Sequence, residues 1–342
     1  MDISVVVACK NEEAFIVDCV QSILASIQFA GVDGEVLVYD GISTDNTWFL
    51  VDQLSKKDQR VKGHINDEQT APFAFNKGIR AAESPVIMIF GAHATMGQTH
   101  ISEVLETLKS YPDAGCVGGL INNIYHDDLG RAIGEAMNSK VGVGNATFRT
   151  GGAKGYVDTV AFGAYKKEVF EQIGLFNTSL TRNQDDEFNY RLTKAGFKIV
   201  FNPVIESSYY VRSSIAKLWS QYYQYGYWKV YVNQLHKAVT SVRQLVPFGL
   251  VLYTVFSVLF SAFLAFAEPR LILLIWIPLF AYLLLIVSTS FSKSTKQKVN
   301  FLILVQSFLT LHFSYGLGYS KGIFDFVVRR KKPSQNASKL TR

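Results

Sequence analysis

The chain has 342 residues, of which 49% are apolar, and it carries a formal net charge of +6 at pH 7. The charge is uneven, because residues 1–243 hold 23 Lys and Arg against 26 Asp and Glu, whereas residues 244–342 hold 11 against 2. The basic excess therefore belongs to an apolar C-terminal region, as at a membrane flank, and argues against a nucleic-acid-binding protein.

Residues 1–243 are expected in the cytosol. The first apolar run, residues 3–8, is too short for a signal peptide and has no basic residues before it. The three cysteines, Cys9, Cys19 and Cys116, have no metal-like spacing and suit a reducing compartment.

Short apolar runs alternate with helical patterns through the first 90 residues. Strands are expected over residues 3–8, 35–39, 61–65 and 86–90, with helices over 16–24, 47–54 and 74–82. This alternation predicts an α/β fold with a Rossmann-like, mostly parallel sheet and flanking helices. Ligands bind such sheets beyond the carboxyl ends of the strands. The polar groups at those ends are Lys10–Glu12, Asp40 and Gly91–His93.

The middle of the chain, residues 115–160, is rich in glycine. Such composition predicts flexible loops, which either move over a substrate or are plain surface loops. A further strand is expected over residues 158–163, and a helix over residues 167–173 that ends at Gly174.

Three consecutive acids, Asp185, Asp186 and Glu187, open a helical pattern after a polar lead-in. Like charges at contact distance raise each other's pKa and resist desolvation. The simplest interpretation is a solvated helix start, where acids are favoured by the helix N-terminus. The alternative is a general base held at a cleft.

The C-terminal third is expected to meet a membrane. Residues 213–243 mix aromatic and basic side chains, as in an amphipathic interfacial helix, although an aromatic core helix has the same composition. Residues 245–267 and 271–291 lack charge and predict a transmembrane hairpin. The third apolar segment, residues 299–320, is ambiguous.

Basic residues on both sides of the third segment restrict its possible membrane topology. Lys293, Lys296 and Lys298 precede it and a basic polar tail, residues 329–342, follows it. Both clusters can lie in the cytoplasm only if the segment does not span, so a re-entrant or interfacial segment is favoured. The predicted domains are residues 1–212, 213–243, 244–328 and 329–342, and the last ten residues are expected to be disordered.

Four blocks of sequence carry a family resemblance. They are Val5–Glu13, Asp40–Thr47, Ala74–Gly78 with Phe90–Ala94, and a last block from Asp158 through Asn183–Arg191 to Gln221–Lys229. Together they resemble the family 2 glycosyltransferases, most closely the succinoglycan-biosynthesis type that elongates lipid-linked exopolysaccharide units. The Asn183–Arg191 block is the most specific of them.

The resemblance implies a GT-A fold and a role for each matching residue. Asp186 would be the base of an inverting transfer, with Asp185 beside it, and crowding by Asp185 and Glu187 would raise the pKa of Asp186. Gln224 and Trp228 would contact the acceptor, although Trp228 could equally anchor its helix at the membrane. The implied nucleotide-sugar-binding residues are Ala8, Lys10, Glu12, Asp40, Asn76, Ala92 and His93, and Asp40 would accept the imide N–H of uracil.

One departure from the family pattern concerns metal binding. The family usually ends its fourth strand with Asp-x-Asp, which binds Mg²⁺ or Mn²⁺ bridging the diphosphate. This chain has Gly91 at the first position and His93 at the third. His93 would then be a lone metal ligand helped by diphosphate oxygens and water, or a direct donor to phosphate, or donor activity is lost.

The resemblance thus implies an inverting, multi-pass glycosyltransferase at the cytoplasmic face of the plasma membrane. It would move a sugar from a nucleoside diphosphate, in the first instance UDP, to a polyprenyl-diphosphate-linked saccharide in extracellular or capsular polysaccharide assembly, alongside other assembly proteins. The alternative is a catalytically impaired membrane protein that keeps the fold as a nucleotide-binding or assembly module. A processive synthase is disfavoured by Tyr227, which replaces an Arg of processive relatives.

Overall fold

The structure is a computed structural model that describes residues 1–211 and 213–333. The chain divides into two compact units: a sheet unit, Met1–Ile124 with Ala146–Tyr210, and a helical unit, Tyr125–Asn145 with Val211–Arg342. Residues 125–145, expected in the N-terminal domain, thus group with the C-terminal helices. Arg212 and residues 334–342, which include most of the predicted polar tail, lie outside the described residues.

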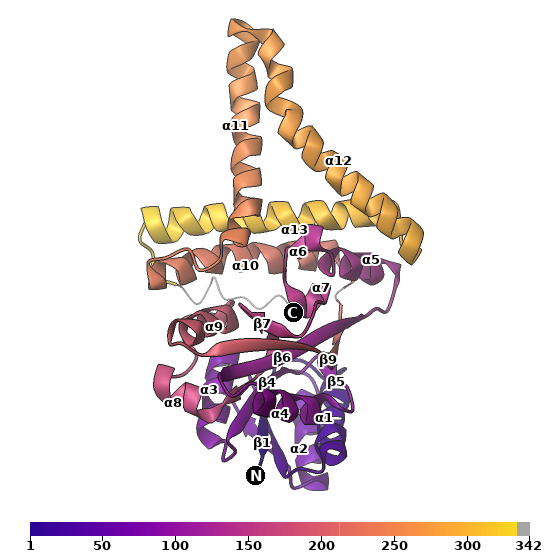
Figure 1. Ribbon diagram of the computed structural model, residues 1–342, viewed down its shortest axis with the longest axis vertical. Coiled ribbons are helices and arrows are strands. Elements are labelled where there is room, and N and C mark those ends of the chain that lie inside the picture. The colour runs from indigo at the N-terminus through magenta and orange to yellow at the C-terminus, as the bar shows by residue number, and fades with distance from the viewer. Residues whose placement is uncertain (212, 334–342) are drawn as a thin grey trace. The chain divides into compact units, whose positions relative to one another are not determined.

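The first half of the sheet unit alternates strands and helices (Figure 1). Strand β1 lies between β2 and β4, and all three of these N-terminal strand pairings, β1–β2, β1–β4 and β2–β3, are parallel. β1 is almost entirely buried and apolar apart from Ser4, as expected for a strand covered on both faces. The elements are β1 (Ile3–Cys9), α1 (Ile16–Ala30), β2 (Gly34–Asp40), α2 (Thr47–Lys57), β3 (Val61–Ile65), α3 (Ala71–Ala81) and β4 (Val86–Gly91).

The second half of the sheet unit makes the sheet mixed. The strand order is β3-β2-β1-β4-β8-β6-β9-β5, with β7 also paired to β9. Here β6–β9 is parallel, whereas β4–β8, β6–β8, β5–β9 and β7–β9 are antiparallel. The elements are β5 (Ala94–Met96), α4 (His100–Ser110), β6 (Ala114–Ile124), α7 (Thr147–Thr150), β7 (Gly155–Val157), β8 (Ala161–Lys166), α8 (Lys167–Ile173), α9 (Gln184–Lys194) and β9 (Lys198–Tyr210).

The expectation of flexible loops at the start of the glycine-rich middle is wrong. Its first part is the buried strand β6, in which the glycines allow neighbouring strands and loops to approach closely. A Cβ on Gly119 would lie 1.8 Å from the carbonyl oxygen of Ile205, and one on Gly118 would lie 2.7 Å from Val160. These glycines are required by packing, which composition alone does not distinguish from flexibility.

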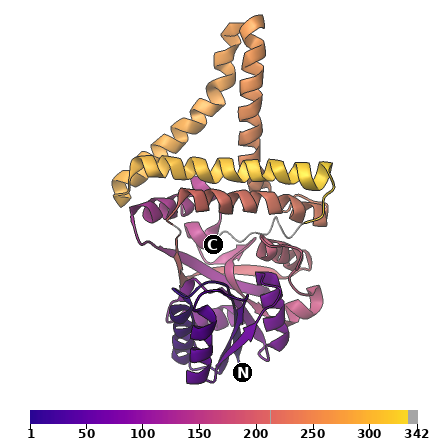
Figure 2. The same ribbon diagram turned by 180° about the vertical axis from the view of Figure 1, so that it is seen from behind.

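The helical unit is built on two long helices that lie side by side, α10 (Ile215–His236) and α13 (Phe301–Gly322) (Figures 1 and 2). A Cβ on Gly318 would lie 2.0 Å from the carbonyl oxygen of Tyr223, and one on Gly226 would lie 2.1 Å from that of Tyr315. The two backbones therefore touch, which only residues without a side chain permit. The other elements are α5 (Asp128–Met137), α6 (Lys140–Val143), η1 (Val242–Leu245), α11 (Val246–Ala267), η2 (Pro269–Leu271), α12 (Ile272–Gln297) and η3 (Ile323–Val328).

Three helices among the described residues are long and apolar enough to cross a membrane. The apolar stretches of Val242–Phe266 and Ile272–Gln297 are only 17% and 11% buried, whereas that of Phe301–Val328 is 50% buried. In Figures 1 and 2, α11 and α12 project from α13 and meet at η2, while α13 follows α10 along its length. The predicted apolar hairpin is thus present, and α13 differs from its two helices in direction and burial.

Candidate active site

Asp40 ends strand β2 and is completely buried. Its Oδ1 accepts a hydrogen bond from the backbone N–H of Ser43 at 2.7 Å. Its Oδ2 has no hydrogen-bond partner among residues 1–211 and 213–333. A buried acceptor without a hydrogen-bond donor destabilises the folded protein. A ligand that donates an N–H, such as a nucleotide base, would satisfy Asp40 Oδ2.

The loops after β1 and β2 are fastened to each other. The backbone N–H of Asn11 donates to Ser43 Oγ at 2.8 Å, and the backbone N–H of Thr44 donates to Asn11 Oδ1 at 2.8 Å. Asn11 has a φ of 55°, a left-handed conformation that asparagine tolerates. Beside it, Lys10 Nζ donates to Gln69 Oε1 at 2.5 Å. The strand ends that sequence reasoning put together therefore do form one surface.

Glu12 and His93 meet at this edge of the sheet. Glu12 is 6% exposed, its backbone N–H donates to Thr47 Oγ1 at 2.7 Å, and its Oε1 lies 3.6 Å from His93 Nδ1. The His93 ring meets the ring of Tyr209 edge to face, with 4.9 Å between centroids. Ala8 pairs with Gly91 across the β1–β4 ladder, and Ala92 is buried behind the histidine.

The space beside Gly91 is filled by an aromatic ring. A Cβ on Gly91 would lie 2.9 Å from Cε1 of Phe162, whose own ring lies 4.6 Å from that of Phe90. Phe162 holds this place with a φ of 50°. The Phe162 ring therefore occupies the space in which the family has a carboxylate at position 91. The sequence showed only that the Asp is missing.

A divalent cation would have two protein ligands here. No group of three His, Cys, Asp or Glu side chains able to hold a metal occurs in the described part of the chain. Glu12 and His93 lie close enough together to offer one oxygen and one nitrogen ligand. Mg²⁺ and Mn²⁺ are commonly held by one or two protein groups together with substrate phosphates, so these residues fit an ion shared with a diphosphate.

The acidic block opens helix α9, as the sequence predicts. Asp185 is exposed, Asp186 is partly buried, and Asp185 Oδ1 accepts a hydrogen bond from the backbone N–H of Asp186 at 2.9 Å. Asn183, the residue before the first residue of α9, is in the left-handed region with a φ of 61°. Asp186 is thus held in the first turn of α9.

Glu187 has a different function from the other two acids. It is 3% exposed and binds Arg191 through both oxygens, at 2.8 Å and 3.0 Å. The same guanidinium donates to the carbonyl oxygens of Ile173 and Leu175. Arg191 therefore balances the charge of Glu187, and the pair fastens α9 to the end of α8.

Asn76, expected at the nucleotide sugar, serves the packing of the sheet unit. It is 4% exposed, its Nδ2 donates to the carbonyl oxygen of Phe176 at 2.9 Å, and its Oδ1 accepts from the N–H of Phe176 at 3.0 Å. This pairing supports a structural function and gives no support to ligand binding.

The two predicted acceptor residues lie on α10. Trp228 is 1% exposed and packs against the rings of Tyr227, Tyr231 and Phe326. Its expected stacking on an acceptor sugar is therefore contradicted, because no ring face is available, and the alternative of an aromatic core helix holds for this residue. Gln224 is partly buried on the same helix.

Arg149, on the short helix α7, is a charged residue that sequence reasoning missed. Its guanidinium carbon lies 5.5 Å from the centroid of the Tyr209 ring, the ring that also meets His93. No motif marks Arg149, because α7 is brought to β9 only by the tertiary fold.

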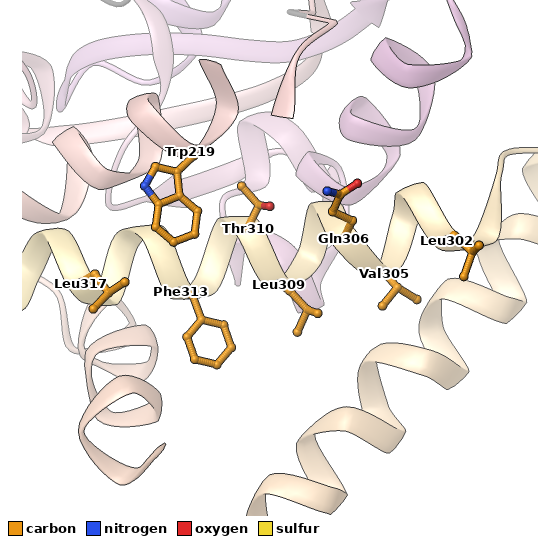
Figure 3. Close-up of a pocket in the computed structure, with 8 residues that line it drawn as sticks. All are labelled: Trp219, Leu302, Val305, Gln306, Leu309, Thr310, Phe313 and Leu317. Atoms are coloured by element: carbon orange, nitrogen blue, oxygen red, sulfur yellow. The ribbon is translucent and has the colours of Figure 1, made fainter. Parts of the chain in front are cut away.

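An apolar pocket of about 430 Å³ lies elsewhere, between α10 and α13 of the helical unit (Figure 3). Gln306 and Thr310 are its only polar lining residues apart from the indole N–H of Trp219. It lacks the charged groups that a sugar nucleotide needs. The lining residues are Trp219, Leu302, Val305, Gln306, Leu309, Thr310, Phe313 and Leu317.

Comparison with known proteins agrees with this geometry. The family model described as glycosyl transferase family 2 matches residues 4–174. A curated relative from Methanococcus voltae, a dolichyl N-acetyl-alpha-D-glucosaminyl phosphate 3-beta-D-2,3-diacetamido-2,3-dideoxy-beta-D-glucuronosyltransferase, is 33% identical over 279 residues, 80% of this chain and 85% of that protein. The succinoglycan biosynthesis protein ExoA of Rhizobium meliloti is 27% identical over 246 residues, 71% of this chain and 73% of that protein.

Among solved structures, the fold is similar to that of a mannosyltransferase from Pyrobaculum calidifontis in complex with GDP-Man and Mn²⁺. The TM-score is 0.57 at 16% identity, over 94% of this chain and 87% of that one. The expected GT-A fold is thereby confirmed. The strand-end surface, the acidic helix start and these matches lead to one conclusion: the chain belongs to glycosyl transferase family 2.

Proposed function

We propose that this protein transfers a sugar, with inversion, from a nucleoside diphosphate to a lipid-linked saccharide used in polysaccharide or glycolipid synthesis. The observation that carries the proposal is Asp40, whose buried Oδ2 at the end of β2 awaits a donor such as a base N–H. A uracil imide N–H satisfies that acceptor, which favours UDP as the carrier.

Five further residues have proposed roles in this reaction. Asp186 is the base that removes the proton of the acceptor hydroxyl while the nucleoside diphosphate leaves from the opposite face of the sugar. Asp185 orients it through the hydrogen bond to its backbone N–H. Lys10 supplies positive charge beside the nucleotide, and Glu12 and His93 would hold a divalent cation, which would supply positive charge to the diphosphate when bound.

The acceptor is proposed from the relatives and from the apolar helices. The Methanococcus voltae relative is named for a dolichyl phosphate substrate, and the Rhizobium meliloti relative for succinoglycan biosynthesis. A chain anchored in the same bilayer as its acceptor meets that acceptor at a raised effective concentration.

The proposed membrane topology is supported by the different directions of the helices. In this proposal the α11–α12 hairpin spans the bilayer, and α13, whose apolar stretch is 50% buried, lies along the cytoplasmic interface beside α10. A cysteine placed at Lys332 is therefore expected to react only after the membrane is opened. The three native cysteines are buried and do not interfere. Labelling of intact cells at position 332 would mean that α13 spans instead.

The base is tested with Asp186→Asn. The amide cannot accept the proton, so transfer falls by about 10²–10⁴-fold, whereas UDP binding by calorimetry stays as in the wild type. The matched control is Asp52→Asn, an exposed helical acid paired with Lys56, which retains full activity. Turnover that survives in Asp186→Asn would remove Asp186 from the role of base.

One observation favours the rival function, a catalytically impaired protein that keeps the fold as a nucleotide-binding or assembly module. Phe162 fills the space in which the family's metal-binding carboxylate would lie. Assaying sugar transfer and sugar-nucleotide hydrolysis with Mn²⁺ and with EDTA separates the two. Metal-dependent transfer is expected, and nucleotide binding without any turnover would support the rival.

A further inference from the structure

We propose that Arg149 binds phosphate, and that its guanidinium receives either the diphosphate of the sugar nucleotide or the phosphate of the lipid-linked acceptor. The inference deepens the proposed function and rests on it for the identity of those two ligands. The binding chemistry itself comes from the surroundings of Arg149 in the sheet unit.

Arg149 is a partly buried charged residue whose hydrogen bonding is incomplete. Its Nη1 is buried and has no hydrogen-bond partner in the described residues, and no carboxylate lies within ion-pair distance of it there. Leaving a charged donor buried and unsatisfied costs more than leaving a neutral one, so such a group is retained where a ligand completes it.

Other arginines of the same unit have such partners. Arg60 meets the carboxylate of Asp58 at 2.6 Å, and Arg191 binds both oxygens of Glu187. Both are explained by structure alone. Arg149 has a ring beneath it instead of an acid, which leaves its positive charge available to an anion.

The ring beneath Arg149 fixes the direction of the guanidinium. The Tyr209 centroid lies 5.5 Å from the guanidinium carbon and the Phe148 centroid lies 5.8 Å from it. A guanidinium packed on aromatic rings keeps its N–H groups in its own plane, where they can donate two parallel hydrogen bonds to a phosphate.

Tyr209 also places Arg149 at the predicted diphosphate position. The same ring meets His93 with 4.9 Å between centroids, and His93 lies beside Glu12 at the end of β4. Strand pairing holds this arrangement, because β9 pairs with β5 at Ala94–Tyr209 and with β6 at Asn123–Tyr209. Arg149 and His93 therefore share Tyr209 as a neighbour, and Glu12 lies beside His93.

The charge balance of that surface explains why an arginine is useful. Gly91 and Phe162 remove one carboxylate from the family's metal-binding pair, so a cation held here has fewer protein ligands. A fixed guanidinium can supply positive charge to the phosphate oxygens without depending on the metal.

The test uses full-length protein in detergent with EDTA present, so that binding through a metal is removed. Calorimetry compares wild type, Arg149→Gln and Arg149→Lys for pyrophosphate, UDP, GDP, uridine and a polyprenyl phosphate in micelles. Lys154→Gln is the matched control, because Lys154 also lies over a tyrosine ring, that of Tyr111 at 5.4 Å, but is exposed.

If the nucleotide diphosphate is the ligand, Arg149→Gln weakens the binding of pyrophosphate and of UDP or GDP by about 10-fold or more and leaves uridine unchanged. If the acceptor phosphate is the ligand, only the polyprenyl phosphate loses affinity. Arg149→Lys keeps the positive charge but cannot donate two parallel hydrogen bonds, so it shows an intermediate loss of affinity. This variant keeps the test valid if Arg149→Gln lowers the melting temperature.

The proposal is overturned if no phosphate ligand binds the wild type, or if both Arg149 variants bind every ligand as Lys154→Gln does. A loss of phosphate affinity in a protein that performs no transfer would support Arg149 while refuting the proposed function. Transfer that depends on Asp186 but not on Arg149, with unchanged phosphate affinity, would refute only the role of Arg149.

Discussion

The two units of this protein stabilise their interiors by different means. In the sheet unit, polar and charged groups enter the core and are paired there: Glu187 binds Arg191, and the buried Glu35 binds both Lys62 and Ser4. In the helical unit, α10 meets α13 through glycines and meets η3 through aromatic rings. The buried Asp325 of this unit accepts hydrogen bonds from Lys321 and Tyr227.

The difference follows from what each unit must hold. The sheet unit brings carboxylates such as Glu187 and Glu35 inside, and a buried charge is tolerated only with a partner. Helices that project apolar side chains outward gain little from the hydrophobic effect in a bilayer, so close backbone contact between small residues becomes the main source of stability.

Trp228→Ala tests the aromatic packing of the helical unit and has the largest expected effect. Removing a fully buried ring is expected to cost about 4 kcal/mol, because the surrounding rings leave a cavity. Thermal unfolding in detergent measures it. Trp219→Ala is the control, since Trp219 is 40% exposed and its loss should change stability much less. Equal effects would mean that Trp228 is not a core residue.

Glu187→Gln tests the ion pairing of the sheet unit. Arg191 then keeps its charge next to two carbonyl oxygens but loses its acid, which is expected to cost about 3 kcal/mol of unfolding free energy. Denaturant unfolding measures the loss. Asp185→Asn, two residues earlier and exposed, should leave stability within about 0.5 kcal/mol of wild type. A stable Glu187→Gln variant would contradict the pairing.

Gly318→Ala tests backbone contact between α10 and α13. The new methyl group would meet the carbonyl oxygen of Tyr223, which cannot rotate away, so the helices must separate at a cost of about 2 kcal/mol. The melting temperature in detergent is the measurement. Gly249→Ala is the control, because a Cβ there meets no atom within 4 Å and alanine favours a helix. Stabilisation of both variants would show that the two backbones are farther apart.

The pH dependence of stability gives the smallest effect. Burial lowers the pKa of His100 to about 4, although the hydrogen bond between its Nδ1 and the carbonyl of Glu206 acts in the opposite direction. The unfolded state, with a pKa near 6.5, takes up the proton first as the pH falls. Stability is therefore complete above pH 6.5 and is lost as the pH approaches 4, by about 1.4 kcal/mol at pH 5.5.

Melting temperatures at pH 7.5 and pH 5.5 measure this dependence. In His100→Gln the difference between the two pH values should shrink by the contribution of the histidine, because glutamine does not titrate. An unchanged difference would mean that another group carries the acid sensitivity.

The parts of the candidate site that lie within one short segment were predictable. Asp40, Lys10 and Glu12 follow buried strands, and the geometry of parallel sheets brings strand ends together whatever the rest of the fold does. Asp185 and Asp186 were predictable because a helix start is a local feature. The partners of these residues were not. In sequence, Glu187 is the third of three acids and nothing separates it from the other two. In the structure it is buried, and Arg191 neutralises its charge.

The glycines show the same limit. Gly119 and Gly318 cannot be distinguished in sequence, because both are glycines among apolar residues. In the structure, Gly119 allows a backbone carbonyl of β9 to approach, and Gly318 allows one of α10. Composition suggested flexible loops for the first region, whereas the fold uses glycine there for close contact.

The sequence by itself determined the class of fold, the strand ends that carry the polar groups, the helix that begins with Asp185 and Asp186, and the apolar hairpin, because each depends on local periodicity. Only the tertiary structure decided that Phe162 replaces a carboxylate beside Gly91, that Trp228 is buried, and that Arg149 lies over Tyr209 next to His93. These are contacts between residues distant in sequence, and their geometry is set by how strands and helices pack.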